Sequence, residues 1–141
     1  MKAVILAAGK GKRLHSEETK LPKCMVRANG RPLLDYVLDY TSFIPREDKI
    51  IVVGFYKEVI EAHLPGYSFA FQREQKGTGD AVMAAYDLLA DYGGDVLVIN
   101  GDMPLIRESS LRALLELHRR EANDCTVLTY YESGELPPFG R

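Results

Sequence analysis

Short apolar runs alternate along the chain with segments in which apolar side chains recur every three or four residues. The runs carry few charges and are typical of strands buried in a parallel sheet; they cover residues 3–8, 49–53, 67–71, 95–99 and 125–130. The helical spacing predicts helices over residues 32–43, 56–64, 80–89 and 109–121. Because strands and helices alternate, we expect an α/β sandwich with right-handed crossovers and a mainly parallel sheet.

Composition limits the size and the setting of this fold. The chain has 141 residues, 46% of them hydrophobic, which is enough for one domain with a core but not for two. The net charge of −2 gives no general attraction for nucleic acid or anionic lipid, and no apolar run approaches the ~20 residues of a membrane span. Cys24 and Cys125 lie far apart in the sequence and do not have the spacing of metal ligands. No signal peptide precedes the first apolar run, so we expect the protein to reside in the reducing cytoplasm.

The first apolar run ends in a basic loop that contains two glycines. Gly9 and Gly11 have no Cβ atoms, so the backbone can bend sharply there and bring its N–H groups against an anion. Four cations lie on or just beyond the bend: Lys10, Lys12, Arg13 and Lys23. This combination indicates a polyphosphate site. The alternative is a surface loop whose lysines are simply solvated.

Two familiar phosphate loops do not fit these residues. The dinucleotide fingerprint requires a third glycine where Leu14 stands, and the Walker loop requires four residues between its glycines, whereas one residue separates Gly9 from Gly11. The stretch resembles instead the signature of the nucleotidyltransferases that make nucleotide-sugars, Leu-Ala-Ala-Gly-x-Gly-x-Arg-Leu followed by Pro-Lys. Residues 6–14 match this signature, and Pro22 and Lys23 complete it.

Two further polar loops follow predicted strands, one after Phe71 and one after Ile99. The first contains a glutamine and a Gly-Thr-Gly string that can hydrogen-bond a flat base, and the second contains Asp102, whose carboxylate can hold Mg²⁺. Ligands of open α/β sheets bind outside the carboxyl ends of the strands, so we expect all three loops to share one crevice. Contacts to phosphate, base and metal together are what an NTP site needs.

The same two loops resemble those of the N-acetylglucosamine-1-phosphate uridylyltransferases, roughly Gln-x-x-Gln-x-Gly-Thr-Gly-x-Ala and Tyr-Gly-Asp-x-Pro-Leu. The matching residues are Gln72, Gln75, Gly77, Thr78, Gly79 and Ala81 in the first loop, and Gly101, Asp102, Pro104 and Leu105 in the second. Asn100 stands where that family has its tyrosine.

This resemblance implies a role for each matching residue. Arg13 and Lys23 would act on the phosphates as catalytic residues, and Asp102 would be both catalytic and the Mg²⁺ ligand. The nucleotide would be bound by Leu6, Ala7, Ala8, Gly9, Gly11, Gln72, Gly77, Thr78, Asn100 and Gly101, with the glutamine, Gly77 and Thr78 on the uracil. Gly140, in a Phe-Gly-Arg string, would touch the sugar.

The resemblance also implies the reaction. An NTP, UTP first, would be joined to a sugar 1-phosphate with Mg²⁺ and release of pyrophosphate. Arg13 and Lys23 lie ten residues apart, a spacing that resembles that of hexose-1-phosphate and phosphocholine nucleotidyltransferases, so mannose 1-phosphate and phosphocholine stay open as acceptors. Molybdopterin is a further alternative acceptor for the same chemistry. A regulatory subunit that binds nucleotide without turnover is the alternative from another class.

The expected fold is then a Rossmann-like three-layer sandwich of the nucleotide-diphospho-sugar transferase type that is incomplete at its C-terminus. Residues 1–141 would form the nucleotide-binding part of a single nucleotidyltransferase domain. The domain of that family continues with sugar contacts and a second metal-binding side chain, so we expect this chain to be inactive alone.

Overall fold

The computed structural model describes residues 1–9 and 21–129, which fall into two compact units. The first unit is Met1–Ile106 and the second is Arg107–Arg141. Within the described residues, every strand belongs to the first unit.

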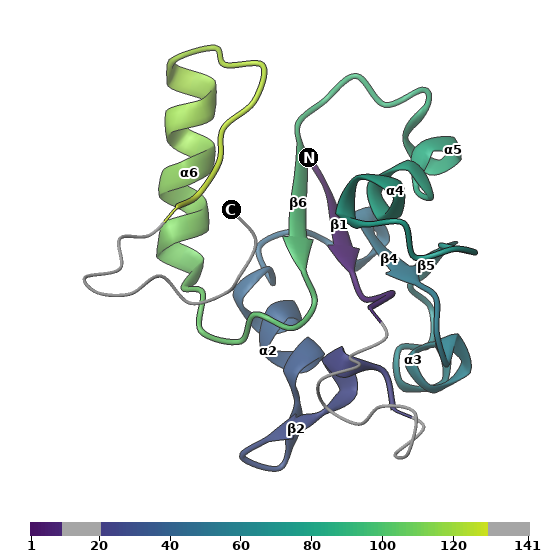
Figure 1. Ribbon diagram of the computed structural model, residues 1–141. Coiled ribbons are helices and arrows are strands. Elements are labelled where there is room, and N and C mark those ends of the chain that lie inside the picture. Colours follow the sequence, from purple (N-terminus) through teal and green to yellow (C-terminus); the bar gives the residue numbers. More distant parts are fainter. Residues whose placement is uncertain (10–20, 130–141) are drawn as a thin grey trace, which may run out of the picture. The chain divides into compact units, whose positions relative to one another are not determined.

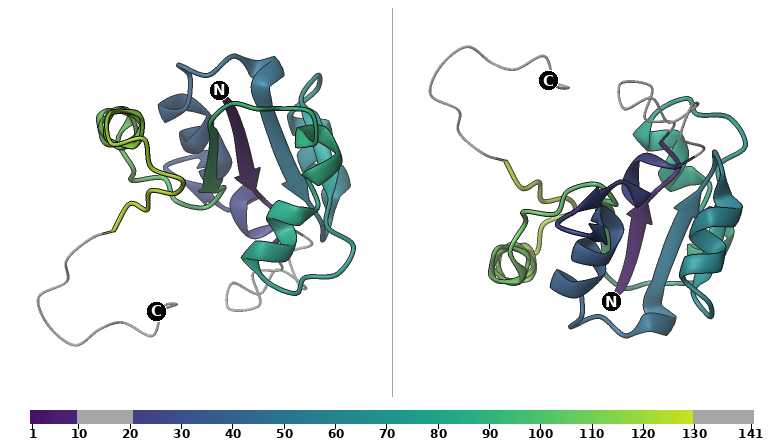
Figure 2. Two further views of the ribbon diagram at one scale, coloured as in Figure 1. Left: turned by 90° about the horizontal axis from the view of Figure 1, so that it is seen from above. Right: turned by 90° about the horizontal axis from the view of Figure 1, so that it is seen from below.

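A four-stranded sheet forms the centre of the first unit (Figure 1). Its strands are β1 (Lys2–Leu6), β4 (Lys49–Val53), β5 (Ser68–Phe71) and β6 (Val96–Asn100), and their order in the sheet is β5-β4-β1-β6. Each neighbouring pair is parallel, with Val4 opposite both Ile50 and Val98. Figure 2 shows the strand arrows running the same way. The predicted parallel sheet is therefore confirmed.

The two central strands are apolar because helices cover both of their faces. Every residue of β4 is buried, and Ala3, Val4 and Ile5 of β1 have no exposed surface. Apolar side chains on both faces of such a strand are buried, so the sequence does not alternate between apolar and polar residues. This is why continuous apolar runs predicted these strands.

Helices connect the strands and lie on both faces of the sheet. They are α2 (Leu33–Tyr40), α3 (Lys57–His63), α4 (Thr78–Met83) and α5 (Tyr86–Leu89). The chain steps from β1 through β4 to β5 and then returns past β1 to β6, so right-handed crossovers place α2 and α3 on one face and α4 on the other. Ala81 and Ala85 accordingly pack with Val4, Ile50 and Val52. The predicted Rossmann-like α/β layering is confirmed.

Short elements fill the connection between β1 and α2. They are a 3₁₀ turn, η2 (Lys23–Met25), and a small antiparallel hairpin of β2 (Arg27–Ala28) and β3 (Arg31–Pro32); another 3₁₀ turn, η3 (Arg46–Asp48), precedes β4. Asn29 and Gly30 form the hairpin turn with φ of 50° and 80°. Positive φ at both central residues is the reason why Asn-Gly is favoured in such turns.

The helix expected over residues 80–89 is interrupted. Ala85 has φ −90° and ψ 2°, and its N–H donates to the carbonyl of Val82 three residues earlier. This tighter bond ends α4 and turns the chain before α5 begins. Apolar spacing alone continues through both pieces and does not reveal the break.

The second unit contains α6 (Glu108–Arg120), close to the expected helix. The strand expected over residues 125–130 is wrong for residues 125–129, which form neither strand nor helix; residue 130 lies outside the described part. Val127 is 73% exposed, and Thr126 Oγ1 instead contacts the Nδ1 atom of His118 at 3.0 Å. A strand needs a neighbour for its backbone N–H and C=O groups, and no described strand pairs with this segment.

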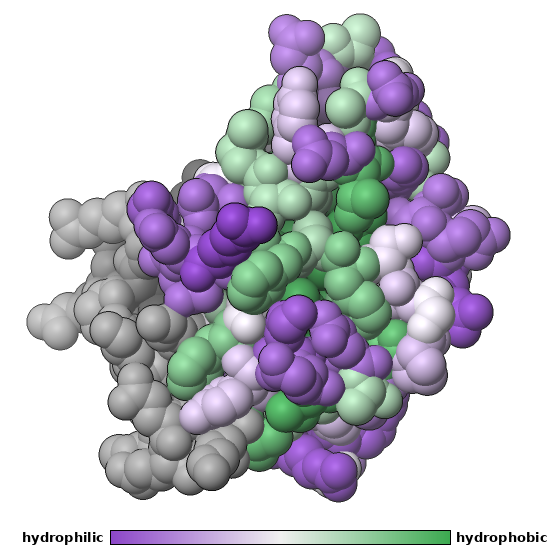
Figure 3. Space-filling view, turned by 90° about the vertical axis from the view of Figure 1, so that its right-hand side faces the viewer, coloured by the Kyte–Doolittle hydropathy of each residue, from purple (hydrophilic) through white to green (hydrophobic). Residues whose placement is uncertain are grey.

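Apolar side chains also reach the surface of the first unit where β5 and α5 lie. Figure 3 shows hydrophobic residues between hydrophilic ones on this side. The exposed large apolar side chains of β5, α4 and α5 are Phe71, Met83, Tyr86 and Leu88. Lys57 Nζ lies 5.0 Å from the centre of the Phe71 ring and partly covers it. None of the helices in the described residues is both long and apolar enough to span a bilayer.

Candidate functional site

A cavity of about 270 Å³ lies at the carboxyl ends of the strands in the first unit. The segments after β1, β5 and β6 form its wall together with the start of η2, so the expected meeting of the three loops is observed. The strand order reverses at β1, and crevices of open α/β sheets form at such a point. The predicted residues that line the cavity are Leu6, Ala7, Ala8, Gly9, Lys23, Gln72, Gly77, Thr78, Asn100 and Asp102.

An ion pair joins two of the predicted catalytic side chains at the cavity. Lys23 Nζ contacts Asp102 Oδ2. Lys23 is the first residue of η2, and Asp102 follows β6 directly after Gly101. The lysine side chain is 47% exposed and the aspartate side chain 23% exposed. Both charges can therefore reach a ligand in the cavity.

Gly101 is expected to contact the nucleotide but does not line the cavity. Its N–H donates to the carbonyl of Leu6 at 2.9 Å. A Cβ atom at this position would lie 3.1 Å from that carbonyl oxygen and 3.3 Å from Leu34 Cδ1. The glycine thus lets the end of β6 stay close to β1, which brings Asp102 to the rim of the cavity.

The loop between β5 and α4 presents a buried amide to the cavity. Gln72 is 4% exposed, and its backbone N–H donates to the carbonyl of Val53 at 2.8 Å, which extends the β4–β5 pairing. Its Nε2 atom donates to the carbonyl of Gly77 at 3.2 Å and to Asp80 Oδ2 at 2.7 Å. Gly77 has φ 126° and ψ −178°, a region that is essentially open only to glycine. The shape of this loop therefore depends on that glycine.

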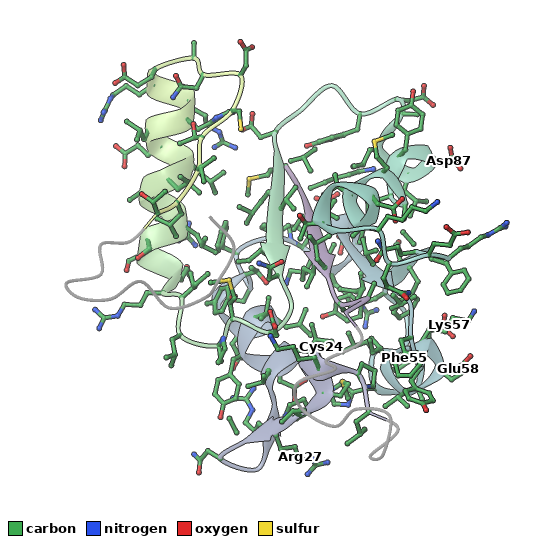
Figure 4. The ribbon with its side chains drawn as sticks, in the orientation of Figure 1. Cys24, Arg27, Phe55, Lys57, Glu58 and Asp87 are labelled. Atoms are coloured by element: carbon green, nitrogen blue, oxygen red, sulfur yellow. The ribbon has the colours of Figure 1, made fainter. Side chains whose placement is uncertain are left out.

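Cys24 lines the cavity although the sequence analysis did not assign it to the site. It is 3% exposed, and its thiol donates a hydrogen bond to the carbonyl oxygen of Ala7, with 3.9 Å between Sγ and that oxygen. Figure 4 shows it inside the fold, whereas Glu58 lies at the periphery. Burial, and then the charge of Asp102, raise the pKa of the Cys24 thiol to about 12, so it is a protonated packing group at neutral pH. Because Cys24 is adjacent to Lys23 in the sequence, it could have been predicted to line the same cavity.

Gln75 and Ala81 also line the cavity and were not among the predicted site residues. Both match the loop motif after β5, which was the signal that could have placed them. Gln75 Nε2 donates to the carbonyl of Gln72 at 3.4 Å, so it supports the turn. The remaining predicted residues, Gly11, Arg13 and Gly140, lie outside the described residues.

Asp102 is the acidic residue of the cavity lining. Over residues 1–9 and 21–129, no three His, Cys, Asp or Glu side chains gather closely enough to hold a metal ion by themselves. Mg²⁺ at phosphate sites is usually held by one or two carboxylates together with the phosphates of the substrate. A single carboxylate facing an open cavity fits an ion of that kind.

Residues 3–140 match the protein family described as "MobA-like NTP transferase domain". Similar curated proteins include the bifunctional protein GlmU of a Cyanothece species, 44% identical over 128 residues, and that of Streptococcus equi subsp. zooepidemicus, 42% identical over 139 residues. These alignments cover 89% and 98% of this chain but 28% and 29% of the relatives. The chain thus spans less than a third of the length of these relatives.

Solved structures share the fold. A UDP-glucose pyrophosphorylase complexed with UDP-glucose has a TM-score of 0.67 at 23% identity, covering 86% of this chain and 54% of that chain. The manganese complex of Rv0371c from Mycobacterium tuberculosis has a TM-score of 0.65 at 16% identity, covering 84% and 59%. At these identities the likeness shows the fold alone.

Proposed function

Because the chain belongs to the family of MobA-like NTP transferase domains, we propose that its cavity binds an NTP and serves nucleotidyl transfer from UTP to a sugar 1-phosphate. The observation that carries this proposal is the meeting of Lys23, Asp102 and Gln72 at one cavity. A cation, a carboxylate and a buried amide are the groups needed for phosphate, Mg²⁺ and base.

In the proposed reaction, an oxygen of the sugar 1-phosphate attacks the α-phosphorus of the NTP. A new P–O bond forms there, and the bond from the α-phosphorus to the oxygen bridging the α- and β-phosphates breaks, so that pyrophosphate leaves with the electron pair. The attacking phosphate is already an anion at neutral pH, so no side chain has to remove a proton. The protein then acts by positioning the reactants and by stabilising charge.

The proposed roles follow from the position of each charge. Lys23 aligns the α-phosphate with the acceptor, and Arg13 neutralises the leaving phosphates. Asp102 would hold Mg²⁺, which would supply neutralisation of phosphate charge and polarisation of the α-phosphate. Lys23 and Asp102 pair with each other in the structure, and incoming phosphates would give the lysine a new anionic partner. The carboxylate of Asp102 would then be available as a ligand for Mg²⁺.

The nucleoside and sugar contacts are proposed in the same way. Gln72, Gly77 and Thr78 contact the base, the segment of residues 6–9 contacts the nucleoside, and Gly140 contacts the sugar. UTP and a sugar 1-phosphate are the substrates that the matching loop motifs imply, and a structural neighbour with the same fold is complexed with UDP-glucose. We place the reaction in the cytoplasm, where the two free cysteines stay reduced.

Calorimetry with UTP, CTP, GTP, ATP and dTTP in the presence of Mg²⁺ tests the binding half of the proposal. We expect UTP to bind, and Asp102→Ala to remove the dependence of its affinity on Mg²⁺. Pyrophosphate release by the protein at its natural length, with N-acetylglucosamine 1-phosphate, glucose 1-phosphate and phosphocholine, tests the acceptor. A folded sample that binds none of the five nucleotides would overturn the proposal.

A further inference from the structure

The amide of Gln72 has only one orientation that satisfies its surroundings. Its nitrogen faces the carbonyl oxygen of Gly77 at 3.2 Å and a carboxylate oxygen of Asp80 at 2.7 Å. Neither oxygen carries a hydrogen, so a flipped amide would set its own oxygen against two acceptors. Both amide N–H groups are therefore engaged inside the protein. What the side chain can still offer a ligand in the cavity is the acceptor Oε1.

Asp80 is the stronger of the two partners that hold this orientation. Its bond to Gln72 is the shorter one, and a bond to an ionised acceptor is about twice as strong as one between neutral groups. Asp80 is half-buried in the first turn of α4, and the next residue, Ala81, is 5% exposed and packs in the core. The carboxylate is thus fixed to a packed helix while Gln72 is fixed to the end of β5.

We propose that Asp80 is a positioning residue that sets the hydrogen-bonding direction of the base site. This inference rests on the proposed function. A glutamine whose oxygen is kept free as an acceptor favours a base that donates a ring N–H. Among the pyrimidines, uracil carries a hydrogen on N3, whereas N3 of cytosine carries a lone pair and would face the fixed oxygen as a second acceptor.

The size of the preference follows from burial. Gln72 is 4% exposed, so an acceptor left facing another acceptor is not rescued by bulk water. A site built to receive a hydrogen bond rejects a ligand that lacks the donor far more strongly than an apolar pocket rejects a small change of shape. We therefore expect UTP to bind at least ~10-fold more tightly than CTP, which corresponds to a difference in binding free energy of about 1.4 kcal/mol or more.

The test is the ratio of the dissociation constants of CTP and UTP, measured by calorimetry with Mg²⁺. Asp80→Ala frees the amide to turn, so the ratio is expected to fall by ~10-fold toward 1. Asp80→Asn still offers an acceptor oxygen and is expected to keep the ratio within ~3-fold of the wild type. Asp87→Ala is the matched control, because it removes an equal charge from exposed α5 (Figure 4).

A double-mutant cycle separates positioning from general damage. Gln72→Leu alone should bring the ratio toward 1, and adding Asp80→Ala to it should then change the ratio no further. A merely structural role of Asp80 would weaken UTP and CTP alike and leave the ratio unchanged. Circular dichroism confirms folding, and if Asp80→Ala does not fold, Asp80→Leu, which keeps the branched shape but offers no acceptor oxygen, replaces it in both measurements.

The outcomes distinguish this inference from the proposed function. A wild type that prefers CTP, an unchanged ratio in Asp80→Ala or Gln72→Leu, or an equal loss in the Ala and Asn variants overturns the inference while nucleotide binding stands. Absence of binding by any NTP in a folded wild-type sample overturns the proposed function and this inference with it.

Discussion

At the scale of single residues, the cavity sets one cation against one carboxylate. Lys23 is 47% exposed and contacts Asp102, so it is held at the cavity without being shut away from a ligand. A preorganised charge stabilises the transition state most where charge shifts during the reaction, and it stabilises the bound substrate less.

Lys23→Ala in the protein at its natural length is therefore expected to lower kcat by ~10²-fold or more, with little change in KM. Steady-state pyrophosphate release measures both constants. Lys76→Ala is the matched control, since that exposed lysine pairs with Glu74 and does not line the cavity. Near-normal kcat with only a raised KM would show that Lys23 binds the substrate without assisting the reaction.

The two cysteines should differ sharply in reactivity. Cys125 is exposed, whereas Cys24 is buried and its pKa is raised to about 12, so at pH 8 almost none of it is the reactive thiolate. We expect a thiol reagent such as dithionitrobenzoate to label one thiol per folded chain rapidly and the second only in denaturant. Raising the pH toward 10 should still leave Cys24 mostly protonated. Rapid labelling of two thiols in the folded protein would contradict its burial.

At the scale of elements, the junction between β5 and α4 depends on a single backbone conformation. Gly77 carries φ 126°, and its carbonyl accepts one of the two bonds from Gln72. A side chain at this position would strain the backbone and move the carbonyl, so both the fold and the base site are affected.

Gly77→Ala is expected to lower the free energy of unfolding by about 1–3 kcal/mol. Gly79→Ala makes the same chemical change inside α4, where φ is not positive and the added Cβ would have no heavy atom within 4 Å apart from its chain neighbours and the backbone of its own helix. That variant should be neutral or more stable by up to about 1 kcal/mol, because alanine is the better helix former. Urea unfolding followed by circular dichroism measures both, and equal effects would show that the loop conformation is not strained by alanine.

At the scale of the whole molecule, a ligand of the folded state alone stabilises it by mass action. The cavity is lined by residues from the ends of three strands, which come together only in the folded first unit. UTP with Mg²⁺ at 100 times its dissociation constant should therefore add about 2.7 kcal/mol to the free energy of unfolding and raise Tm by several degrees. Thermal unfolding with and without UTP measures this. An unchanged Tm at saturating UTP would contradict binding to the folded cavity.

The sequence by itself determined the kind and order of most elements. The apolar run at residues 49–53 coincides with β4, and the helical spacing near residues 109–121 coincides with most of α6. These patterns are local, because a strand buried on both faces must be apolar throughout and an amphipathic helix must repeat every three to four residues. The alternation of the two patterns also sufficed to predict the parallel sheet, and with it the edge at which the three loops meet.

Only the tertiary structure decided the features that depend on distant neighbours. The break before Ala85 and the absence of a strand at residues 125–129 follow from backbone partners that apolar composition does not specify. The burial of Cys24 and the bond from Gln72 to Asp80 depend on how η2 and α4 pack against β1 and β5. The sequence specifies the chemistry of each side chain. Packing across the whole first unit decides which groups come within hydrogen-bonding distance of one another.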